Sequence, residues 1–156
     1  MKTISYAITV CNELEEITKL LNFLQLHIRK EDEIVIQYDE SSVTDDVKEY
    51  ITLMGSMHKN HIVVGFPLNK DFATFKNNLK SHCTKDYIFQ VDADEIPHEY
   101  LVEYLGEVLE TNPVDIVFVP RVNTVEGLEQ SHIDKWKWNV NDKGWVNFPD
   151  YQTRIY

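Results

Sequence analysis

The strongest constraint on the fold is an alternation of short β-rich runs with longer amphipathic stretches along the first 120 of 156 residues. The β-rich runs cover residues 4–10, 33–38, 61–64, 87–91 and 115–119. Some of them, such as IVI at residues 34–36, are apolar at consecutive positions, which is typical of strands buried on both faces. The alternation predicts an α/β fold with a mostly parallel central sheet and helices on both faces.

The stretches between these runs carry apolar residues at helical spacing. After the first run, Asn12 and Glu15 match a capping box, and one apolar helical face follows, at Leu14, Ile17, Leu20, Leu21, Leu24 and Ile28. Further helices are predicted around residues 47–54 and 72–79, and over residues 97–109 with Pro97 in the first turn. No internal repeat or Pro/Gly-rich linker divides the chain, so we expect a single domain.

The charge and the N-terminus limit the class of protein. The net charge is −11, which excludes direct nucleic-acid binding because phosphate contacts require a basic surface. Residues 1–10 lack the features of a signal peptide, and no apolar run is long enough to cross a bilayer. We therefore expect a cytoplasmic protein without a membrane span. Cys11 and Cys83 have no metal-ligand spacing, and in that compartment they are expected to be free thiols.

The segment FQVDADEIP, residues 89–97, takes an apolar strand directly into three carboxylates. In an extended chain Asp92 and Asp94 point to the same face, at the carboxyl edge where open α/β sheets bind ligands. Two carboxylates at that edge are suitable hard oxygen ligands for Mg²⁺ or Mn²⁺. The alternative is that Asp94 or Glu95 caps the helix predicted to begin at Pro97.

The second predicted strand also ends in polar side chains, at Asp39, Ser41 and Ser42. The carboxylate of Asp39 is placed to accept hydrogen bonds from a ribose or a base, and the two hydroxyls are able to donate. Asp and Ser are also favoured in a turn that leads into a helix, so a purely structural role explains these residues equally well. Both interpretations of Asp39 stay open at this point.

Four motifs in this order resemble the family 2 inverting glycosyltransferases of GT-A fold, in particular their lipopolysaccharide-glucosyltransferase-like branch. They are TVCNE at residues 9–13, YDESS at 38–42, DFATFKN at 71–77 and DYIFQVDADE at 86–95. The resemblance implies a Rossmann-like GT-A fold and transfer of a sugar, with inversion, from a nucleotide-sugar donor, often UDP-linked. It also implies a glycan or lipid-linked glycan as the acceptor.

The resemblance also assigns residues to the donor site. The base would lie near the end of the first strand and Asp39, and a divalent ion, Mn²⁺ or Mg²⁺, would be held by Asp92 and Asp94. Lys76 stands where the branch commonly carries an arginine, and it retains the positive charge for a phosphate contact. The donor-binding residues expected in this way are Thr9, Cys11, Glu13, Asp39, Lys76, Asp92 and Ala93.

Residues 145–156, WVNFPDYQTRIY, resemble the same branch, whose members normally continue further. We therefore expect residues 1–120 to form the donor-binding portion and residues 121–156 the start of an acceptor portion in the same domain, with part of the acceptor half lacking. Inverting transfer requires a base opposite the diphosphate, and Asp150 is the only carboxylate in this closing motif. Glu126 and Glu129 lie in the preceding loop.

Aromatic residues gather in the same region, at Trp136, Trp138, Trp145, Phe148, Tyr151 and Tyr156. They would suit either a sugar-binding wall or a core beneath a long loop.

Two other classes of protein compete with an active transferase. One is a donor-binding module without catalysis, and the other is a haloacid-dehalogenase-like phosphatase, because residues 92–96, DADEI, loosely resemble the nucleophile motif of that family.

Overall fold

The computed structural model describes all residues, 1–156, and has an α/β architecture. Its elements follow in the order β1 (Ile4–Val10), α1 (Leu14–His27), β2 (Glu33–Asp39), α2 (Asp45–Met57), β3 (His61–Phe66), α3 (Phe72–Ser81), β4 (Tyr87–Asp92), α4 (Glu99–Thr111), β5 (Val117–Asn123), α5 (Gln130–Trp136) and β6 (Val146–Ile155). The chain forms two compact units, residues 1–115 with Tyr156, and residues 116–155. Residue 120, where the donor-binding portion was predicted to end, lies within β5 of the second unit.

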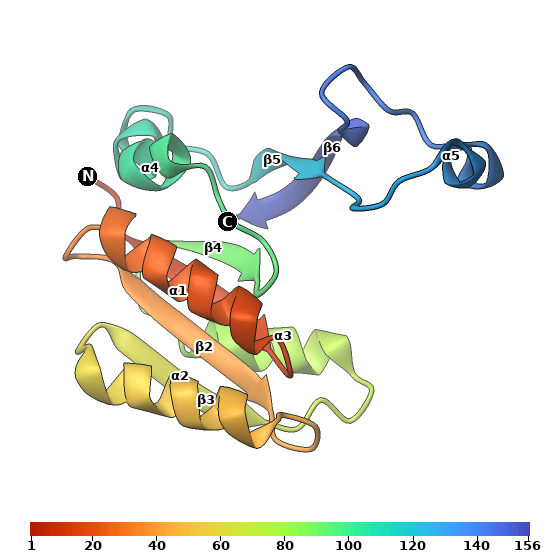
Figure 1. Cartoon of the computed structure of the whole chain (residues 1–156). Helices are drawn as coiled ribbons and strands as arrows, with labels where there is room; N and C mark the ends of the chain where they lie inside the picture. The colour runs from red at the N-terminus through yellow and green to blue at the C-terminus, as the bar shows by residue number, and fades with distance from the viewer. The chain divides into compact units, whose positions relative to one another are not determined.

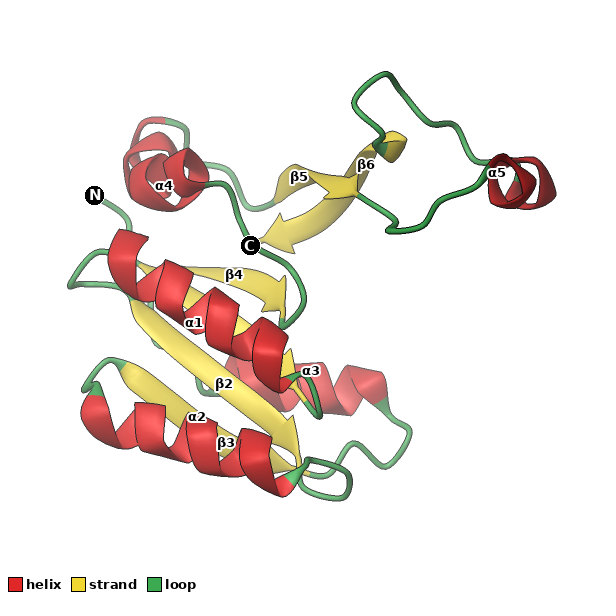
Figure 2. Ribbon diagram, viewed as in Figure 1, coloured by secondary structure: helices red, strands yellow, loops and turns green.

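The first unit contains four parallel strands in the order β3-β2-β1-β4. Helices α1 and α2 lie on one face of these strands and α3 on the other, as predicted (Figures 1 and 2). Along the sequence, β2 and β3 follow on one side of β1, and β4 then pairs with the other side of β1. The strand order therefore reverses between β1 and β4, and ligands bind at the carboxyl edge of such a switch point.

The helices pack through their apolar faces, but α1 begins differently from the prediction. Ile17, Leu20, Leu21 and Leu24 are buried, as the spacing indicates. The predicted capping box is wrong, because α1 starts at Leu14 with Glu13 at the N-cap and no side-chain cap. The Glu13 carboxylate instead accepts hydrogen bonds from the loop amides of Cys11 and Asn12, at 2.8 and 3.0 Å. It satisfies amides in the loop before the helix and so leaves the helix uncapped.

Helix α4 begins two residues later than predicted, at Glu99. Its N-cap is His98, whose Nδ1 accepts a hydrogen bond from the amide of Tyr100 at 3.3 Å. Proline precedes the cap, where a fixed φ is compatible with extended chain. The alternative in which Asp94 or Glu95 caps this helix is therefore wrong, and both carboxylates lie in the loop that follows β4.

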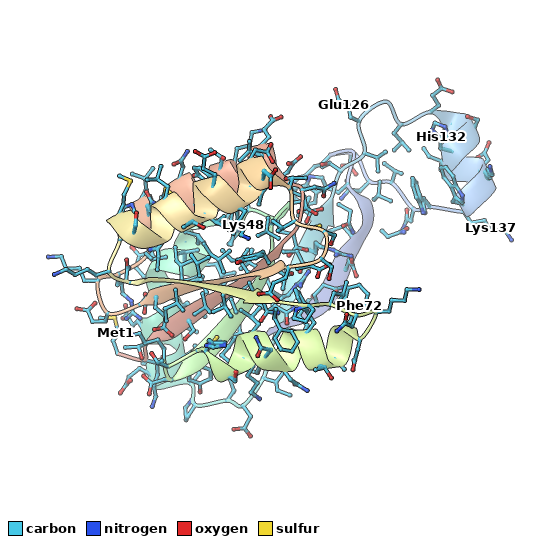
Figure 3. All side chains as sticks on the ribbon, turned by 90° about the horizontal axis from the view of Figure 1, so that it is seen from below. Met1, Lys48, Phe72, Glu126, His132 and Lys137 are labelled. Atoms are coloured by element: carbon cyan, nitrogen blue, oxygen red, sulfur yellow. The ribbon has the colours of Figure 1, made fainter.

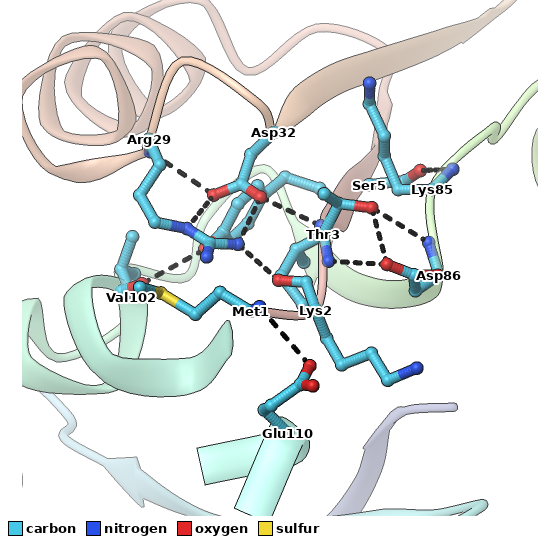
Figure 4. Close-up of polar contacts among 12 residues, drawn as sticks. Met1, Lys2, Thr3, Ser5, Arg29, Asp32, Lys85, Asp86, Val102 and Glu110 are labelled. Atoms are coloured by element: carbon cyan, nitrogen blue, oxygen red, sulfur yellow. Dashed lines mark hydrogen bonds and ion pairs between the residues drawn. The ribbon is translucent and has the colours of Figure 1, made fainter. Parts of the chain in front are cut away.

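A buried ion pair closes the amino edge of the strands (Figure 4). The carboxylate of Asp32, whose side chain is fully buried, lies 2.6 Å from the Arg29 guanidinium and accepts a hydrogen bond from the amide of Ile4 at 2.9 Å. Arg29 also donates to the carbonyl of Lys2 at 2.5 Å. Asp32 therefore joins the segment after α1 to the start of β1.

The second unit is an antiparallel pair, β5 and β6, with α5 in the connection between them. The fifth strand starts at Val117 rather than at the predicted residue 115, and the sequence analysis did not predict α5. Trp136 and Tyr151 are 50% and 62% exposed. Because both rings are at least half exposed, the interpretation that they fill a core is wrong. Few side chains of this unit are buried, among them Val146 and Ile155.

Acidification is expected to weaken the fold through His61, at the start of β3. Its ring is buried, and its Nε2 has no hydrogen-bond partner. Burial, together with the neighbouring His58, lowers the pKa of His61 from 6.5 to about 4. Between these values the unfolded chain binds more protons than the folded chain, so stability falls as the pH falls. The slope is at most about 1.4 kcal/mol per pH unit for one proton.

Urea unfolding of the parent chain and of His61→Gln, followed between pH 7 and pH 4, measures this effect. The variant is expected to lose less stability over this range than the parent. Equal pH dependence in the two proteins would show that His61 is not responsible.

Candidate functional site

Three of the predicted donor-site residues meet at the switch point between β1 and β4. Thr9 and Asp92 are register partners at the carboxyl ends of these strands. The Nζ atom of Lys76, from α3, lies 3.1 Å from the Thr9 hydroxyl and 3.4 Å from Asp92 Oδ1. Both charged side chains are partly exposed, Lys76 at 29% and Asp92 at 38%, so they remain accessible to a ligand.

Helix α3 is held against the strands by a residue that the sequence analysis missed. Gln37, in β2, is completely buried. Its Nε2 donates to the carbonyl of Phe75 at 2.7 Å, and its Oε1 accepts from Asn78 at 2.7 Å. These contacts lie on both sides of Lys76 along the helix and fix its position. A glutamine inside the otherwise apolar run of β2 was the available signal, because a buried amide needs partners.

The first turn of α3 lies at the surface. Phe72 is 67% exposed at the first position of the helix (Figure 3), whereas Phe75 and Leu79 are buried. The Asp71 carboxylate caps this helix by accepting from the amide of Thr74 at 3.1 Å. Phe75 and Leu79 therefore anchor the helix, and Phe72 is left at the surface.

The geometry assumed for Asp92 and Asp94 is wrong. Strand β4 ends at Asp92, and the amide of Glu95 donates to the Asp92 carbonyl at 3.0 Å, which closes a tight turn over Ala93 and Asp94. The chain is therefore not extended from Asp92 to Asp94, so alternation does not place their side chains on one face. Ala93 is buried and Asp94 is exposed in this turn.

Asp39 organises two loops at the same edge of the strands. Its carboxylate accepts four hydrogen bonds, from the amide and hydroxyl of Ser41, from the Ser42 hydroxyl and from the amide of Leu68. The Ser42 hydroxyl and then the Leu68 amide lower the pKa of Asp39 to about 2. The turn interpretation therefore has direct support, while a contact with a nucleoside stays a prediction.

Cys11 lies beside this cluster, and the Glu13 carboxylate accepts a hydrogen bond from the Cys11 amide at 2.8 Å. The thiol of Cys11 is 3.3 Å from the Ser42 hydroxyl, and its carbonyl accepts from the amide of Thr44 at 3.1 Å. The loop after β1 is therefore tied to the loop after β2. The two cysteines are free thiols, as predicted.

Asp150, the predicted base, lies in the second unit and is paired there. Its carboxylate accepts from Arg121 at 2.7 Å, from Asn123 at 3.1 Å and from Gln152 at 2.7 Å. The amide of Asn123, followed by Arg121 and Gln152, holds the pKa of Asp150 below its usual value. A lowered pKa weakens a carboxylate as a proton acceptor. Its role as the base stays a prediction, against which this pairing argues.

The residues at the switch point have the chemistry to hold a divalent cation. Asp92 and Asp94 provide carboxylate oxygens, which Mg²⁺ and Mn²⁺ prefer. The ammonium group of Lys76 is a protein cation that already lies beside Asp92, at 3.4 Å. No group of three or more His, Cys, Asp or Glu side chains is arranged as a metal site. A divalent cation at this edge would therefore depend on oxygen ligands from Asp92 and Asp94.

Several solved structures are similar in fold to this chain. Residues 1–349 of TarS from S. aureus give a TM-score of 0.67 at 19% identity, over 83% of this chain and 38% of that chain. The same protein in complex with UDP gives 0.67 at 18% identity, over 83% and 38%. The mannosyltransferase PcManGT from Pyrobaculum calidifontis, in complex with GDP-Man and Mn²⁺, gives 0.61 at 19% identity, over 76% and 35%.

At these low identities the TM-scores show similarity of fold alone. The chain spans 38% of residues 1–349 of TarS and 24% of the longer TarS chain of another structure. The sequence matches no curated protein. No helix of the chain combines the length and the apolar character that crossing a bilayer requires. The model of the family described as glycosyl transferase family 2 matches residues 5–154, nearly the whole chain. The chain therefore belongs to glycosyltransferase family 2.

Proposed function

We propose that this chain binds a nucleotide-sugar donor, UDP-linked, together with Mn²⁺ or Mg²⁺, at the carboxyl edge of β1 and β4. The observation that carries the proposal is the convergence of Thr9, Lys76 and Asp92 at the switch point. Family membership supports sugar transfer as the reaction. Complexes of the similar structures with UDP and with GDP-Man and Mn²⁺ support a nucleotide sugar and a divalent ion as the ligands.

The charges at this site support the proposal that a cation is needed. The protein has a net charge of −11, and a diphosphate approaching Asp92 and Asp94 would be repelled. In the proposed site the two aspartates hold the metal ion, and the ammonium of Lys76 is the nearest protein cation for a phosphate oxygen. The bound ion would stabilise the negative charge that develops on the departing diphosphate.

The proposed reaction is an in-line displacement. A hydroxyl oxygen of a glycan or lipid-linked glycan bonds to the anomeric carbon of the sugar as the bond from that carbon to the diphosphate breaks. Attack from the face opposite the leaving group inverts the configuration, and the hydroxyl proton passes to a base. The first unit supplies the donor side of this reaction, because Thr9, Asp39, Lys76 and Asp92 all belong to it.

The test is incubation of the protein with UDP-GlcNAc, UDP-glucose or GDP-mannose, with and without Mn²⁺, while released nucleoside diphosphate and donor binding are measured. Metal-dependent binding with release of the diphosphate supports a transferase. Metal-dependent binding without release in the presence of sugar acceptors would favour the donor-binding module. Hydrolysis of a simple phosphate ester without any nucleotide would point to the phosphatase instead.

Asp39→Ala is expected to weaken UDP binding about tenfold, because hydrogen bonds to a charged group are lost. The loops after β2 and β3 lose their common acceptor when the carboxylate is removed. The metal dependence of the remaining binding should be unchanged, since Asp39 lies at the end of β2 rather than beside Asp92. Calorimetric titration with UDP measures both quantities.

Asp45→Ala is the matched control for Asp39→Ala, because it removes a carboxylate from the exposed first turn of α2. It is expected to bind UDP like the parent chain. Parent-like binding by Asp39→Ala as well would remove Asp39 from the donor site.

A further inference from the structure

The ammonium of Lys76 lies beside Asp92, one of the two carboxylates of the proposed cation site. Its Nζ is 3.4 Å from Asp92 Oδ1. We propose that Lys76 is an internal counter-ion that competes with the divalent cation for Asp92, so that the metal binds tightly only when a donor diphosphate is present. This inference rests on the proposed function, since it concerns the same metal and the same donor.

Lys76 is held in this place by its surroundings. The Thr9 hydroxyl is a second acceptor for Nζ, at 3.1 Å. On either side of it in α3, the Phe75 carbonyl and the Asn78 amide are bonded to the buried Gln37. The helix therefore cannot shift away from the strands without breaking buried hydrogen bonds, which keeps the backbone of Lys76 within reach of Asp92.

The charges at the site then couple the metal to the donor. A divalent cation and an ammonium group on the same carboxylate repel each other at short range, which weakens binding of the metal alone. A diphosphate offers several anionic oxygens, and so it attracts Lys76 away from Asp92 while it helps to bind the metal. Lys76 thus positions the donor and also lowers the affinity of the donor-free protein for the cation.

Replacement of Lys76 with methionine tests the inference, because it removes the charge and retains an unbranched side chain. Lys80→Met is the matched control, since it makes the same change in net charge one turn further along α3, where Nζ lies 5.4 Å from the ring of Tyr156. The measurement is titration with Mn²⁺ alone, in which the electron paramagnetic resonance signal of the free ion is followed, and then the same titration with UDP. Circular dichroism melting confirms that each variant is folded.

We expect Lys76→Met to bind Mn²⁺ about tenfold more tightly than Lys80→Met when no nucleotide is present, the size of effect typical of a nearby like charge. The increase in Mn²⁺ affinity on adding UDP should be smaller in Lys76→Met than in Lys80→Met. Lys76→Arg retains the charge and should behave like the parent chain.

Equal donor-free Mn²⁺ affinity in Lys76→Met and Lys80→Met would overturn the counter-ion role and leave the proposed function intact, provided that the parent chain binds UDP with Mn²⁺. Absence of any joint binding of UDP and Mn²⁺ by the parent chain would overturn both. A Lys76→Met chain that melts without a cooperative transition is replaced by Lys76→Gln, to which the same two outcomes apply.

Discussion

Asp94→Ala is expected to weaken Mn²⁺-dependent binding of UDP by about 100-fold or more, the upper end of the losses seen when groups that support a metal ion are removed. In the proposed site Asp94 is one of only two protein carboxylates on the cation. The side chain is exposed in the turn after β4, and no packing depends on it. The melting temperature should therefore stay that of the parent chain, and the loss should appear in calorimetric titration alone.

Glu99→Ala is the control for this experiment, because it removes an exposed carboxylate from the first turn of α4. It is expected to bind UDP and Mn²⁺ like the parent. If Asp94→Ala also keeps the parent's affinity for both ligands, the metal is not held by Asp94, and the turn at residues 93 and 94 has no role in the donor site.

Asp32→Ala is expected to destabilise the first unit by about 3 kcal/mol, because it leaves a partly buried guanidinium without its partner. The carboxylate is fully buried and also accepts from the amide of Ile4 at 2.9 Å. That amide would become a buried donor without an acceptor. Urea unfolding at neutral pH measures the change in the free energy of unfolding.

Glu15→Ala breaks the exposed pair with Lys19 on α1 and serves as the comparison. Exposed pairs of this kind contribute little to stability, so this variant should unfold at nearly the same urea concentration as the parent. Equal stability of Asp32→Ala and Glu15→Ala would mean that the Arg29–Asp32 pair does not hold the amino edge.

The parallel core was predictable from the sequence because its signals are local. Consecutive apolar residues identify β1 and β2, and the 3.6-residue period identifies the buried face of α1. The polar residues after β2 and β4 indicated the edge of the sheet at which ligands would bind. The family resemblance is confirmed at the level of glycosyltransferase family 2, while membership of the lipopolysaccharide-glucosyltransferase-like branch stays a prediction.

The remaining features depend on contacts between distant residues or on the competition for a few amides. Lys76 and Asp92 lie together because α3 packs against the strands, in part through its hydrogen bonds to Gln37, and no short segment carries that information. Glu13 binds the loop amides in place of the predicted cap, which the motif alone did not reveal. The alternation of side chains expected of a strand does not continue past Asp92, because a turn follows it. The residue pattern alone did not show that β4 ends there.

Calorimetric titration of the parent chain with UDP, once in Mn²⁺ and once in EDTA, tests the central claim most directly. The proposed site has only two carboxylates and one lysine near the diphosphate, and the whole chain is acidic. We therefore predict saturable binding of UDP in Mn²⁺ and no measurable binding in EDTA. Equal affinity in the two conditions would contradict a donor site in which a metal ion joins the diphosphate to Asp92 and Asp94.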